Sequence, residues 1–476
     1  MRLLVIAYEF PPSPSPQSLR WAYLCRELAA RGHEVHVLTI DLGPDNPGLP
    51  ALPPEVCIHR TWPGPLRGIT AWSRKRNIAR VQAARAAQAN SSTGAASNAS
   101  SAATAEPGST APQVAPPIAA VADGVGERLP FEMPKPTRLG AVKAFIWSVL
   151  LRIGEYTVFP DIRGEWLWPA RKRLRQLLRE HAFDAVISSH EPATTLQLGL
   201  LAQARGIAFV ADLGDPVLAG YTPPRWRGRA LRLEAEVARK AALVTVTADS
   251  AAVLLRERHR TLAPVHVITQ GFVATPPAPL DIGTLFDPAR LELLYTGSFY
   301  AFRRPEALLD AVLATPGARL NVATVQAPDV LKRMAAAHPD AIRLLGFLPH
   351  LRALQLQRRA DVLVNIANAD NTQIPGKLYE YAGACRPILH ITPQPDQDPS
   401  ADWIRAHERG WVSADDQQTL AAHIRRAAAD KREGRLGSGL DLSAGRVAAF
   451  SWERGADTLD TLLQNLGRDA QPTAST

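Results

Sequence analysis

The apolar positions of this chain form short runs that alternate with amphipathic stretches of helical spacing. The run 2–8 has the length of a buried strand, residues 18–31 carry apolar side chains at helical spacing up to Gly32, and 34–39 alternates like a strand. This order predicts that the chain opens with a strand–helix–strand unit.

The same alternation returns twice further along the chain. Helices are expected at 141–153, 166–181, 193–205, 226–240 and 250–258, and strands at 185–188, 207–211, 243–247 and 265–269. A Pro-rich stretch at 276–279 is expected to be a hinge. Beyond it, strands fit 291–296, 320–324, 342–345, 362–366 and 388–391, with helices between them. Two such runs predict two doubly wound α/β lobes with parallel sheets, and ligands bind beyond the carboxyl ends of such strands. The lobes are expected to span 1–275 and 276–450 and to face each other across a cleft.

One segment, residues 81–130, does not fit this pattern. It consists mostly of Ala, Ser, Thr, Gly and Pro and has no steady hydrophobic period. Such a segment cannot bury enough apolar surface to offset the entropy of ordering, so we expect a disordered insertion in the first lobe. The tail 469–476 is also expected to be disordered.

Composition narrows the class of protein. Of the 476 residues, 46% are hydrophobic and 21% charged, as in globular proteins with two domains. No apolar run is long enough to span a bilayer and the start lacks the features of a signal peptide, so the expected location is the cytoplasm. Three scattered cysteines argue against a disulfide framework and a structural zinc site. The net charge of +9 is compatible with nucleic acid, anionic lipid or phosphorylated substrates as binding partners, and does not distinguish among them.

Candidate anion-binding residues open the second lobe. Gly297 and Ser298 follow a strand and allow a tight turn, and Arg303 and Arg304 precede a helix. Guanidinium groups at a helix start suit a diphosphate, although a solvated arginine pair would give the same pattern.

The sharpest motif is the stretch 372–381, TQIPGKLYEY, a loop that enters a helix. Gly376 lies where the loop enters the helix, and Lys377 and Glu380 can share one helix face because they are three residues apart. A carboxylate there can accept from two ribose hydroxyls and an ammonium can meet phosphate. The alternative is an intrahelical salt bridge on a surface helix.

Candidate residues of the first lobe also follow strands. The loop 9–18 is rich in proline and shapes one wall of the cleft or binds an anion. His190 and Glu191 lie at the end of one strand, and Asp212 and Asp215 follow the next. A histidine can bond hydroxyls or take protons, and the carboxylates can grip acceptor hydroxyls or cap the turn that follows.

The residues quoted above resemble the family 4 glycosyltransferases over nearly the whole chain outside the insertion. The resemblance rests on YEFPPSPSPQSLR, RELAARGHEVHVLT, SSHEPATT, DLGDP, YTGSFYAFRRPEALLDA, LGFLPH, RADVLVNIA and IPGKLYEYAGACRPIL. It implies the GT-B fold, in which two Rossmann-like lobes face each other. The ending FSWERGADTLDTLL looks like the family's last helix, expected at 451–468, which crosses back onto the first lobe.

The resemblance also implies roles for single residues. Glu380 matches the carboxylate that holds the donor's ribose, Arg303 the cation on the donor diphosphate, and His190 the histidine near the transferred sugar. The implied reaction is sugar transfer from a nucleotide-diphosphate sugar to a hydroxyl of a glycan or lipid-linked acceptor, with retention and with neither metal nor cofactor. The chain differs from the family at Thr372, where a second glutamate is usual, and at Ser298, where a second arginine is usual. These differences resemble a branch with a KLYEY-type donor motif.

Three further expectations concern partners and alternatives. Aromatic residues near 145–168 lie among many basic ones, which suits a peripheral contact with the inner, anionic face of a membrane, although the tryptophans could instead pack inward. A nucleotide-sugar epimerase on a similar fold and a non-catalytic basic binding protein remain open. Nucleic acid is not expected as a partner, because no recognition motif accompanies the charge.

Overall fold

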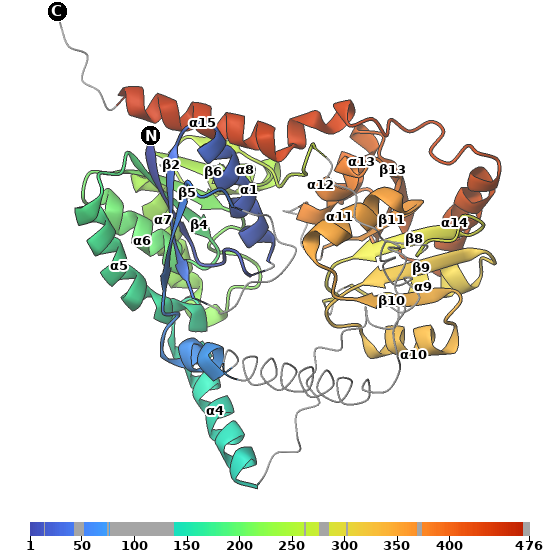
Figure 1. The fold of residues 1–476 in the computed structure, drawn as a ribbon, viewed down its shortest axis with the longest axis horizontal. Coiled ribbons are helices and arrows are strands. Elements are labelled where there is room, and N and C mark those ends of the chain that lie inside the picture. Colours follow the sequence, from blue (N-terminus) through green and yellow to red (C-terminus); the bar gives the residue numbers. More distant parts are fainter. Residues whose placement is uncertain are drawn as a thin grey trace, which may run out of the picture.

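The protein forms two α/β lobes that lie side by side, with one long helix along both (Figure 1). The computed structural model describes residues 1–13, 15–41, 52–73, 76, 138–260, 263–275, 285–300, 303–368 and 374–469, with the backbone alone for 138–146 and 469. The predicted insertion at 81–130, the Pro-rich stretch 276–279 and the tail beyond 469 lie outside these residues.

The first lobe is built on a seven-stranded sheet of order β3-β2-β1-β4-β5-β6-β7, in which every pair is parallel. Its strands are β1 (Arg2–Ala7), β2 (Glu34–Ile40), β3 (Val56–Thr61), β4 (Ala185–His190), β5 (Ala208–Leu213), β6 (Leu243–Val246) and β7 (Val265–Val267). Its helices include α1 (Pro16–Ala30), α4 (Arg138–Thr157), η1 (Ile162–Trp166), α5 (Leu167–Glu180), α6 (Thr194–Gln203), α7 (Pro224–Lys240) and α8 (Asp249–Arg258), and residues 65–73 are helical as well. Helices cover both faces of the sheet, which is why the central strands are almost continuously apolar.

The second lobe repeats the design with a six-stranded parallel sheet of order β10-β9-β8-β11-β12-β13. Its strands are β8 (Leu291–Thr296), β9 (Ala318–Ala323), β10 (Ile342–Gly346), β11 (Val362–Ile366), β12 (Ile388–Thr392) and β13 (Gly410–Ala414). Its helices are α9 (Glu306–Leu313), α10 (Asp329–Ala337), α11 (His350–Arg359), α12 (Gly376–Gly383), α13 (Pro399–Ala406) and α14 (Gln417–Arg432), followed by η2 (Gly445–Phe450). The predicted fold class, two doubly wound lobes with parallel sheets, is confirmed.

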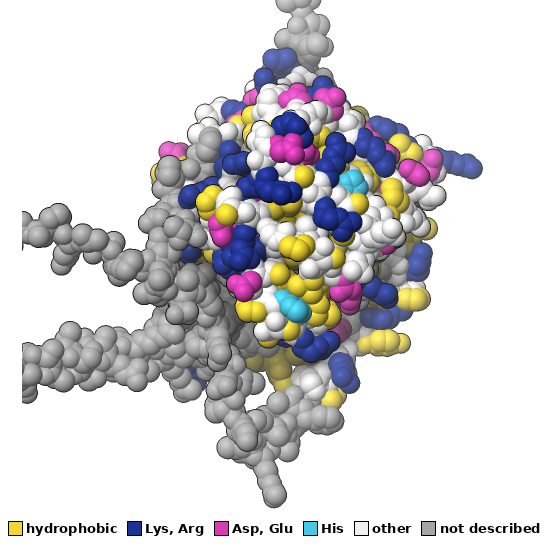
Figure 2. All heavy atoms as spheres, turned by 90° about the vertical axis from the view of Figure 1, so that its right-hand side faces the viewer, with side chains coloured by type: hydrophobic (Ala, Val, Ile, Leu, Met, Phe, Trp, Pro, Cys, Tyr) yellow, Lys and Arg dark blue, Asp and Glu magenta, His cyan; other side chains and the backbone are white. Residues whose placement is uncertain are grey.

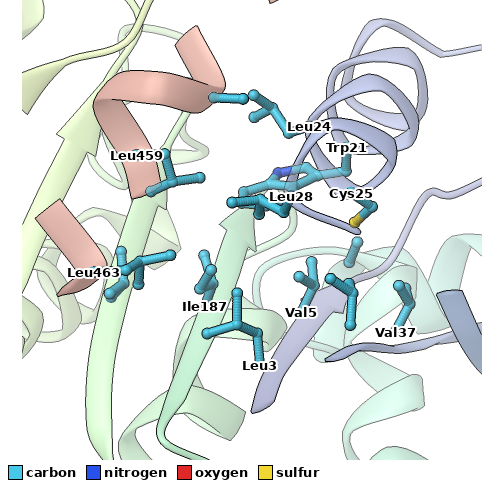
Figure 3. Close-up of a cluster of buried hydrophobic side chains, with 14 of the residues drawn as sticks. Leu3, Val5, Trp21, Leu24, Cys25, Leu28, Val37, Ile187, Leu459 and Leu463 are labelled. Carbon is cyan, nitrogen blue, oxygen red and sulfur yellow. The ribbon is translucent and has the colours of Figure 1, made fainter. Parts of the chain in front are cut away.

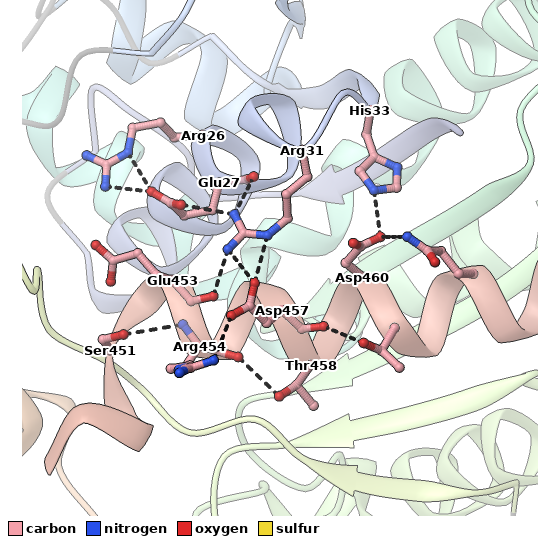
Figure 4. A network of polar contacts seen from close by, with 12 residues as sticks. Arg26, Glu27, Arg31, His33, Ser451, Glu453, Arg454, Asp457, Thr458 and Asp460 are labelled. Carbon is pink, nitrogen blue, oxygen red and sulfur yellow. Dashed lines mark hydrogen bonds and ion pairs between the residues drawn. The ribbon is translucent and has the colours of Figure 1, made fainter.

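The last helix, α15 (Trp452–Asp469), returns from the second lobe to the first. Leu459 and Leu463 pack with Leu24 and Leu28 of α1 over strand β1 (Figure 3). Polar contacts flank this core, because Asp457 accepts from Arg31 at 2.7 Å and Asp460 lies 2.8 Å from Nε2 of His33 (Figure 4). These contacts fix α15 on the first lobe and hold the lobes together.

No helix among the described residues is both long enough and apolar enough to cross a bilayer. On the face of the second lobe that Figure 2 shows, Lys and Arg side chains are scattered among acidic and apolar ones.

Candidate active site

The carboxyl ends of the two parallel sheets face a common cleft of about 1280 Å³. The first lobe lines it with loops that follow β1, β4, β5 and β6, and the second lobe with loops that follow β8, β9, β10 and β11 and with the start of α12. Among the lining residues are Glu9, Gln17, Arg163, Glu191, Asp215, Tyr221, Gly297, Ser298, Arg303, His350, Lys377 and Glu380. Arg303 and Glu380, predicted from separate motifs, thus line the same cleft.

Arg303 lies in the loop between β8 and α9 and is only 8% exposed. Its Nη1 donates to the carbonyl of Ser298 at 3.1 Å, and its Nη2 donates to the side-chain oxygen of Asn368, which follows β11. These bonds join two neighbouring loops of the sheet and hold the guanidinium group at the cleft wall. An arginine held in this way is preorganised for an anion.

Lys377, in the first turn of α12, supplies a second cation. Its Nζ lies 4.0 Å from the ring centre of Tyr295 and has no hydrogen-bond partner among the described residues. Burial, together with the nearby charge of Arg303, lowers the pKa of Lys377 well below its usual value. A buried ammonium without an acceptor is costly, so the group has a strong preference for an incoming anion.

The backbone beside these cations is also suited to an anion. Gly297 has φ +135°, which requires glycine, and a Cβ at this position would lie 3.8 Å from Nζ of Lys377. Pro375, at the N-cap of α12, provides no side-chain cap. Gly376 and Lys377, the first residues of this helix, line the cleft without a capping side chain, at the positive end of the helix dipole.

Glu380 lies one turn further along α12, partly exposed to the cleft. Its Oε1 is 3.9 Å from Nδ1 of His350, the first residue of α11. The other ring nitrogen of His350 lies 3.0 Å from the hydroxyl of Tyr23 on α1. Tyr23 stacks on Trp452, the first residue of α15, at 5.5 Å. The candidate ribose-binding carboxylate is therefore linked through His350 to the first lobe.

The first lobe contributes a group of carboxylates and their partners. Glu191 accepts from Nη2 of Arg163 at 3.1 Å and from the hydroxyl of Tyr221 at 3.0 Å, and Asp215 accepts from the same hydroxyl at 2.7 Å. Burial acts to raise the pKa of Glu191, yet the charges of His190 and Arg163 and its hydrogen bonds hold it below the usual value. Burial and the two carboxylates raise the pKa of Tyr221. Two carboxylates and a phenol are arranged to bind hydroxyl groups.

His190 does not line the cleft. It is 3% exposed, and its Nδ1 lies 2.8 Å from the carbonyl of Asp215. Its own carbonyl accepts from the side chain of Gln17 in the proline-rich loop. The structure thus places His190 directly behind Glu191 and Asp215, where it holds the loop after β5.

Asp212, expected on the acceptor side, is buried below the cleft with 1% of its surface exposed. It accepts from Nε and Nη2 of Arg20 at 3.2 and 2.9 Å, from the indole of Trp21 at 3.1 Å and from Thr245 at 2.7 Å. Its oxygens are thus occupied within the protein. Asp212 anchors α1 to the sheet and has no surface left for a substrate.

The remaining predicted residues divide between cleft and surface. Gly297, Ser298 and Gly376 line the cleft, whereas Arg304 is exposed outside it, near Asp415. Thr372 lies outside the described residues. Of the two arginines expected to meet a diphosphate, the structure brings only Arg303 into the cleft.

Several cleft residues had not been singled out from the sequence. Arg163 belongs to the basic stretch near 145–168 for which a membrane contact is expected, and no motif of the sequence singles out Tyr221 or His350. Their partners are distant in the sequence: Glu191 lies 28 residues from Arg163, and Tyr23 lies 327 residues from His350. The one local feature of the sequence that points to a site role is that His350 follows a predicted strand.

Comparison with known proteins supports this architecture. Residues 127–273, in the first lobe, match the model of a family described as Glycosyltransferase Family 4. No match to a curated protein was found. Sucrose-phosphate synthase from Thermosynechococcus elongatus has a TM-score of 0.63 at 14% identity, over 99% of this chain and 100% of that chain.

Two other solved structures have the same arrangement. A mutant of S. aureus TarM, in complex with fondaparinux, alpha-GlcNAc-glycerol and UDP, has a TM-score of 0.58 at 9% identity, over 97% of this chain and 99% of that one. A putative UDP-N-acetylglucosamine 2-epimerase from Listeria monocytogenes has a TM-score of 0.51 at 10% identity, over 100% of this chain and 99% of that chain. At these identities the likeness establishes the fold, which is the two-lobed GT-B arrangement.

Proposed function

We propose that this protein is a glycosyltransferase that moves a sugar from a nucleotide-diphosphate sugar to a hydroxyl group of an acceptor. The observation that carries the proposal is the division of the cleft. Arg303, Lys377 and the uncapped start of α12 line the second-lobe wall together with Glu380, and the opposite wall carries Glu191 and Asp215. Such a cleft suits a phosphorylated donor on one side and a hydroxyl-rich acceptor on the other.

On the donor side, transfer breaks the bond between the anomeric carbon and the diphosphate oxygen, and the diphosphate leaves with an added negative charge. The guanidinium of Arg303 and the ammonium of Lys377 are positioned to stabilise that charge as it develops. Glu380 accepts from the ribose hydroxyls and fixes the position of the nucleotide. Two buried cations and a helix terminus supply the charge stabilisation, so the proposed reaction requires no bound metal or cofactor.

On the acceptor side, the oxygen of a hydroxyl forms the new bond to the anomeric carbon as its proton passes to an oxygen of the departing diphosphate. Glu191 and Asp215 accept hydrogen bonds from acceptor hydroxyls, and Tyr221 holds both carboxylates in place. His190 acts through the loop of Asp215, as a positioning residue. Retention of the anomeric configuration rests on the resemblance to family 4, and NMR of the product anomer tests it directly.

The test is a turnover assay. UDP, GDP and ADP are first screened for binding, and the sugar conjugate of the nucleotide that binds is then incubated with candidate glycan and lipid-linked acceptors. The proposal expects the nucleoside diphosphate to be released in step with sugar transfer. If the protein binds the nucleotide sugar but leaves it intact with every acceptor, the result would contradict sugar transfer.

An epimerase is the second candidate, because the Listeria epimerase shares the fold along the whole chain. An epimerase would convert one nucleotide sugar into another without an acceptor. NMR of the donor after incubation with the protein alone distinguishes the two, since a transferase leaves the sugar configuration unchanged.

We further propose that the first lobe rests on the inner face of a membrane and takes its acceptor there, in polysaccharide or glycolipid synthesis. Support comes from exposed apolar side chains on and near α4, with Trp168 71%, Tyr156 66% and Ile153 53% exposed. Trp166, by contrast, packs inward against Tyr8. Sedimentation with vesicles of anionic and of neutral lipid at low salt tests this proposal, and equal absence of binding to both would exclude it.

A further inference from the structure

A cluster of histidines lies at the opposite end of the first sheet from the cleft. Glu34 and His36 alternate on β2 and so share one face of it, and His181 is the C-cap residue of α5. His36 is 3% exposed, whereas Glu34 and His181 are open to solvent in part. Because the cleft lies beyond the carboxyl ends of the strands, this group near their amino ends is separate from the candidate active site.

The three side chains converge on one point. One ligand atom of each, a carboxylate oxygen or a ring nitrogen, lies within 4.8 Å of the other two. Oε1 of Glu34 is 3.0 Å from Nε2 of His36, and the rings of His36 and His181 are 4.5 Å apart. With metal–ligand bonds of about 2.0 Å, the ligand atoms of a tetrahedral site lie about 3.3 Å apart. Small side-chain rotations are therefore enough to close the site around an ion.

Neighbouring residues already hold two of the three groups in place. Oε2 of Glu34, the oxygen turned away from His36, lies 2.8 Å from Nε of Arg2. Nδ1 of His36, the nitrogen turned away from Glu34, lies 2.9 Å from Nε2 of His59 on β3. Contacts of this kind from a second layer of residues fix the orientation of metal ligands. They leave one oxygen and one nitrogen directed at the shared point.

We propose that Glu34, His36 and His181 form a binding site for a divalent transition metal, with zinc as the best fit. Imidazole nitrogens with one carboxylate suit zinc and its neighbours, whereas calcium and magnesium prefer oxygen ligands. The ion fastens β2 to the end of α5, and three protein ligands leave a fourth position for water. Its role is structural, because the site is remote from the cleft. The ligands are 147 residues apart at most, so no short sequence motif reveals them.

Zinc binding to the purified full-length chain tests the proposal. The protein is stripped with a chelator, loaded with zinc sulfate and desalted, and the retained zinc is measured by mass spectrometry. The expected result is one zinc per chain and a higher apparent melting temperature. X-ray absorption at the zinc edge should show nitrogen and oxygen neighbours at about 2.0 Å and no sulfur.

The variants are His181→Ala and Glu34→Gln, which change partly exposed side chains and should preserve the fold by circular dichroism. Each should lose the retained zinc and the gain in melting temperature. His338→Ala, an exposed histidine of the second lobe, and Cys57→Ser, a thiol on β3 opposite His36, are matched controls that should retain the zinc. The site does not exist if the unmodified chain retains no zinc, or if both ligand variants retain as much as the controls.

Discussion

The hydroxyl of Tyr23 in the first lobe lies 3.0 Å from Nε2 of His350 in the second lobe, and the other ring nitrogen of His350 lies 3.9 Å from the carboxylate of Glu380. This chain of contacts joins α1 to α12 across the cleft. It connects the relative position of the two lobes with the carboxylate that we assign to the donor.

Removal of this link should weaken donor use without harming the fold. Tyr23→Phe keeps the stack on Trp452 and loses only the hydroxyl, so we expect a loss of about 1 kcal/mol, or about fivefold in kcat/KM for the donor. Steady-state kinetics with varied donor measures it. As a control, Tyr156→Phe removes an exposed phenol hydroxyl on α4, outside the cleft, and should leave this kcat/KM unchanged. An unchanged kcat/KM in Tyr23→Phe would show that the contact between Tyr23 and His350 does not contribute to donor use.

Donor binding should depend on pH through Lys377. Burial lowers the pKa of this lysine in the free protein, and a bound diphosphate raises it again. Between these two pKa values binding takes up a proton, so the affinity should fall as pH rises. Below the lower pKa the lysine is charged in both states and the dependence should vanish. Isothermal titration of the nucleoside diphosphate in buffers of different ionisation enthalpy measures the proton uptake.

The matched variant for this test is Lys377→Arg, which stays charged at all these pH values. Its affinity should vary less with pH than that of the unmodified protein. The same proton uptake in Lys377→Arg would mean that another group titrates.

Asp212 and Glu191 should respond differently to mutation, although both are carboxylates that follow neighbouring strands. Asp212→Ala leaves the buried Arg20 without its partner, so we expect a loss of about 3–5 kcal/mol of stability. Urea unfolding measures it. Glu191→Gln should keep the melting temperature and raise the KM for the acceptor. A stable Asp212→Ala protein with an acceptor defect would restore the role first expected for Asp212.

Tyr221 should matter for the acceptor and not for the donor. Tyr221→Phe removes the one hydroxyl proton that Glu191 and Asp215 share, and a hydrogen bond to a charged group contributes about 1.5–3 kcal/mol. We expect the acceptor KM to rise about tenfold while donor affinity, measured by titration, stays unchanged. A change in donor affinity alone would show that the two walls of the cleft are assigned wrongly.

The sequence predicts most of the fold because the central strands are buried on both faces and read as plain apolar runs. The edge strands β3 and β13 are not predicted, because they lack such an apolar run. In β3, only Val56 of six residues is fully buried, and in β13, only Ser413 of five. An edge strand with polar or half-buried side chains carries little of the hydrophobic signal on which strand prediction depends.

The donor wall of the cleft was predictable because its residues are close together in the sequence. Lys377 and Glu380 share one helical turn, and Arg303 follows the first strand of its lobe. The acceptor wall depends on contacts between distant segments. Nothing near Asp212 shows that Arg20, 192 residues away, would occupy it, whereas Asp215, three residues later, reaches the cleft.

The most direct test is titration of the nucleoside diphosphate into the unmodified protein and into Arg303→Ala and Glu380→Ala, with Glu433→Ala, the exposed C-cap residue of α14, as control. Each cleft variant loses charge-assisted hydrogen bonds of about 1.5–3 kcal/mol to the ligand, so its Kd should rise by roughly 10- to 100-fold while circular dichroism shows that the fold is kept. The control should bind like the unmodified protein. Unchanged affinity in both folded cleft variants would contradict the assignment of the donor site.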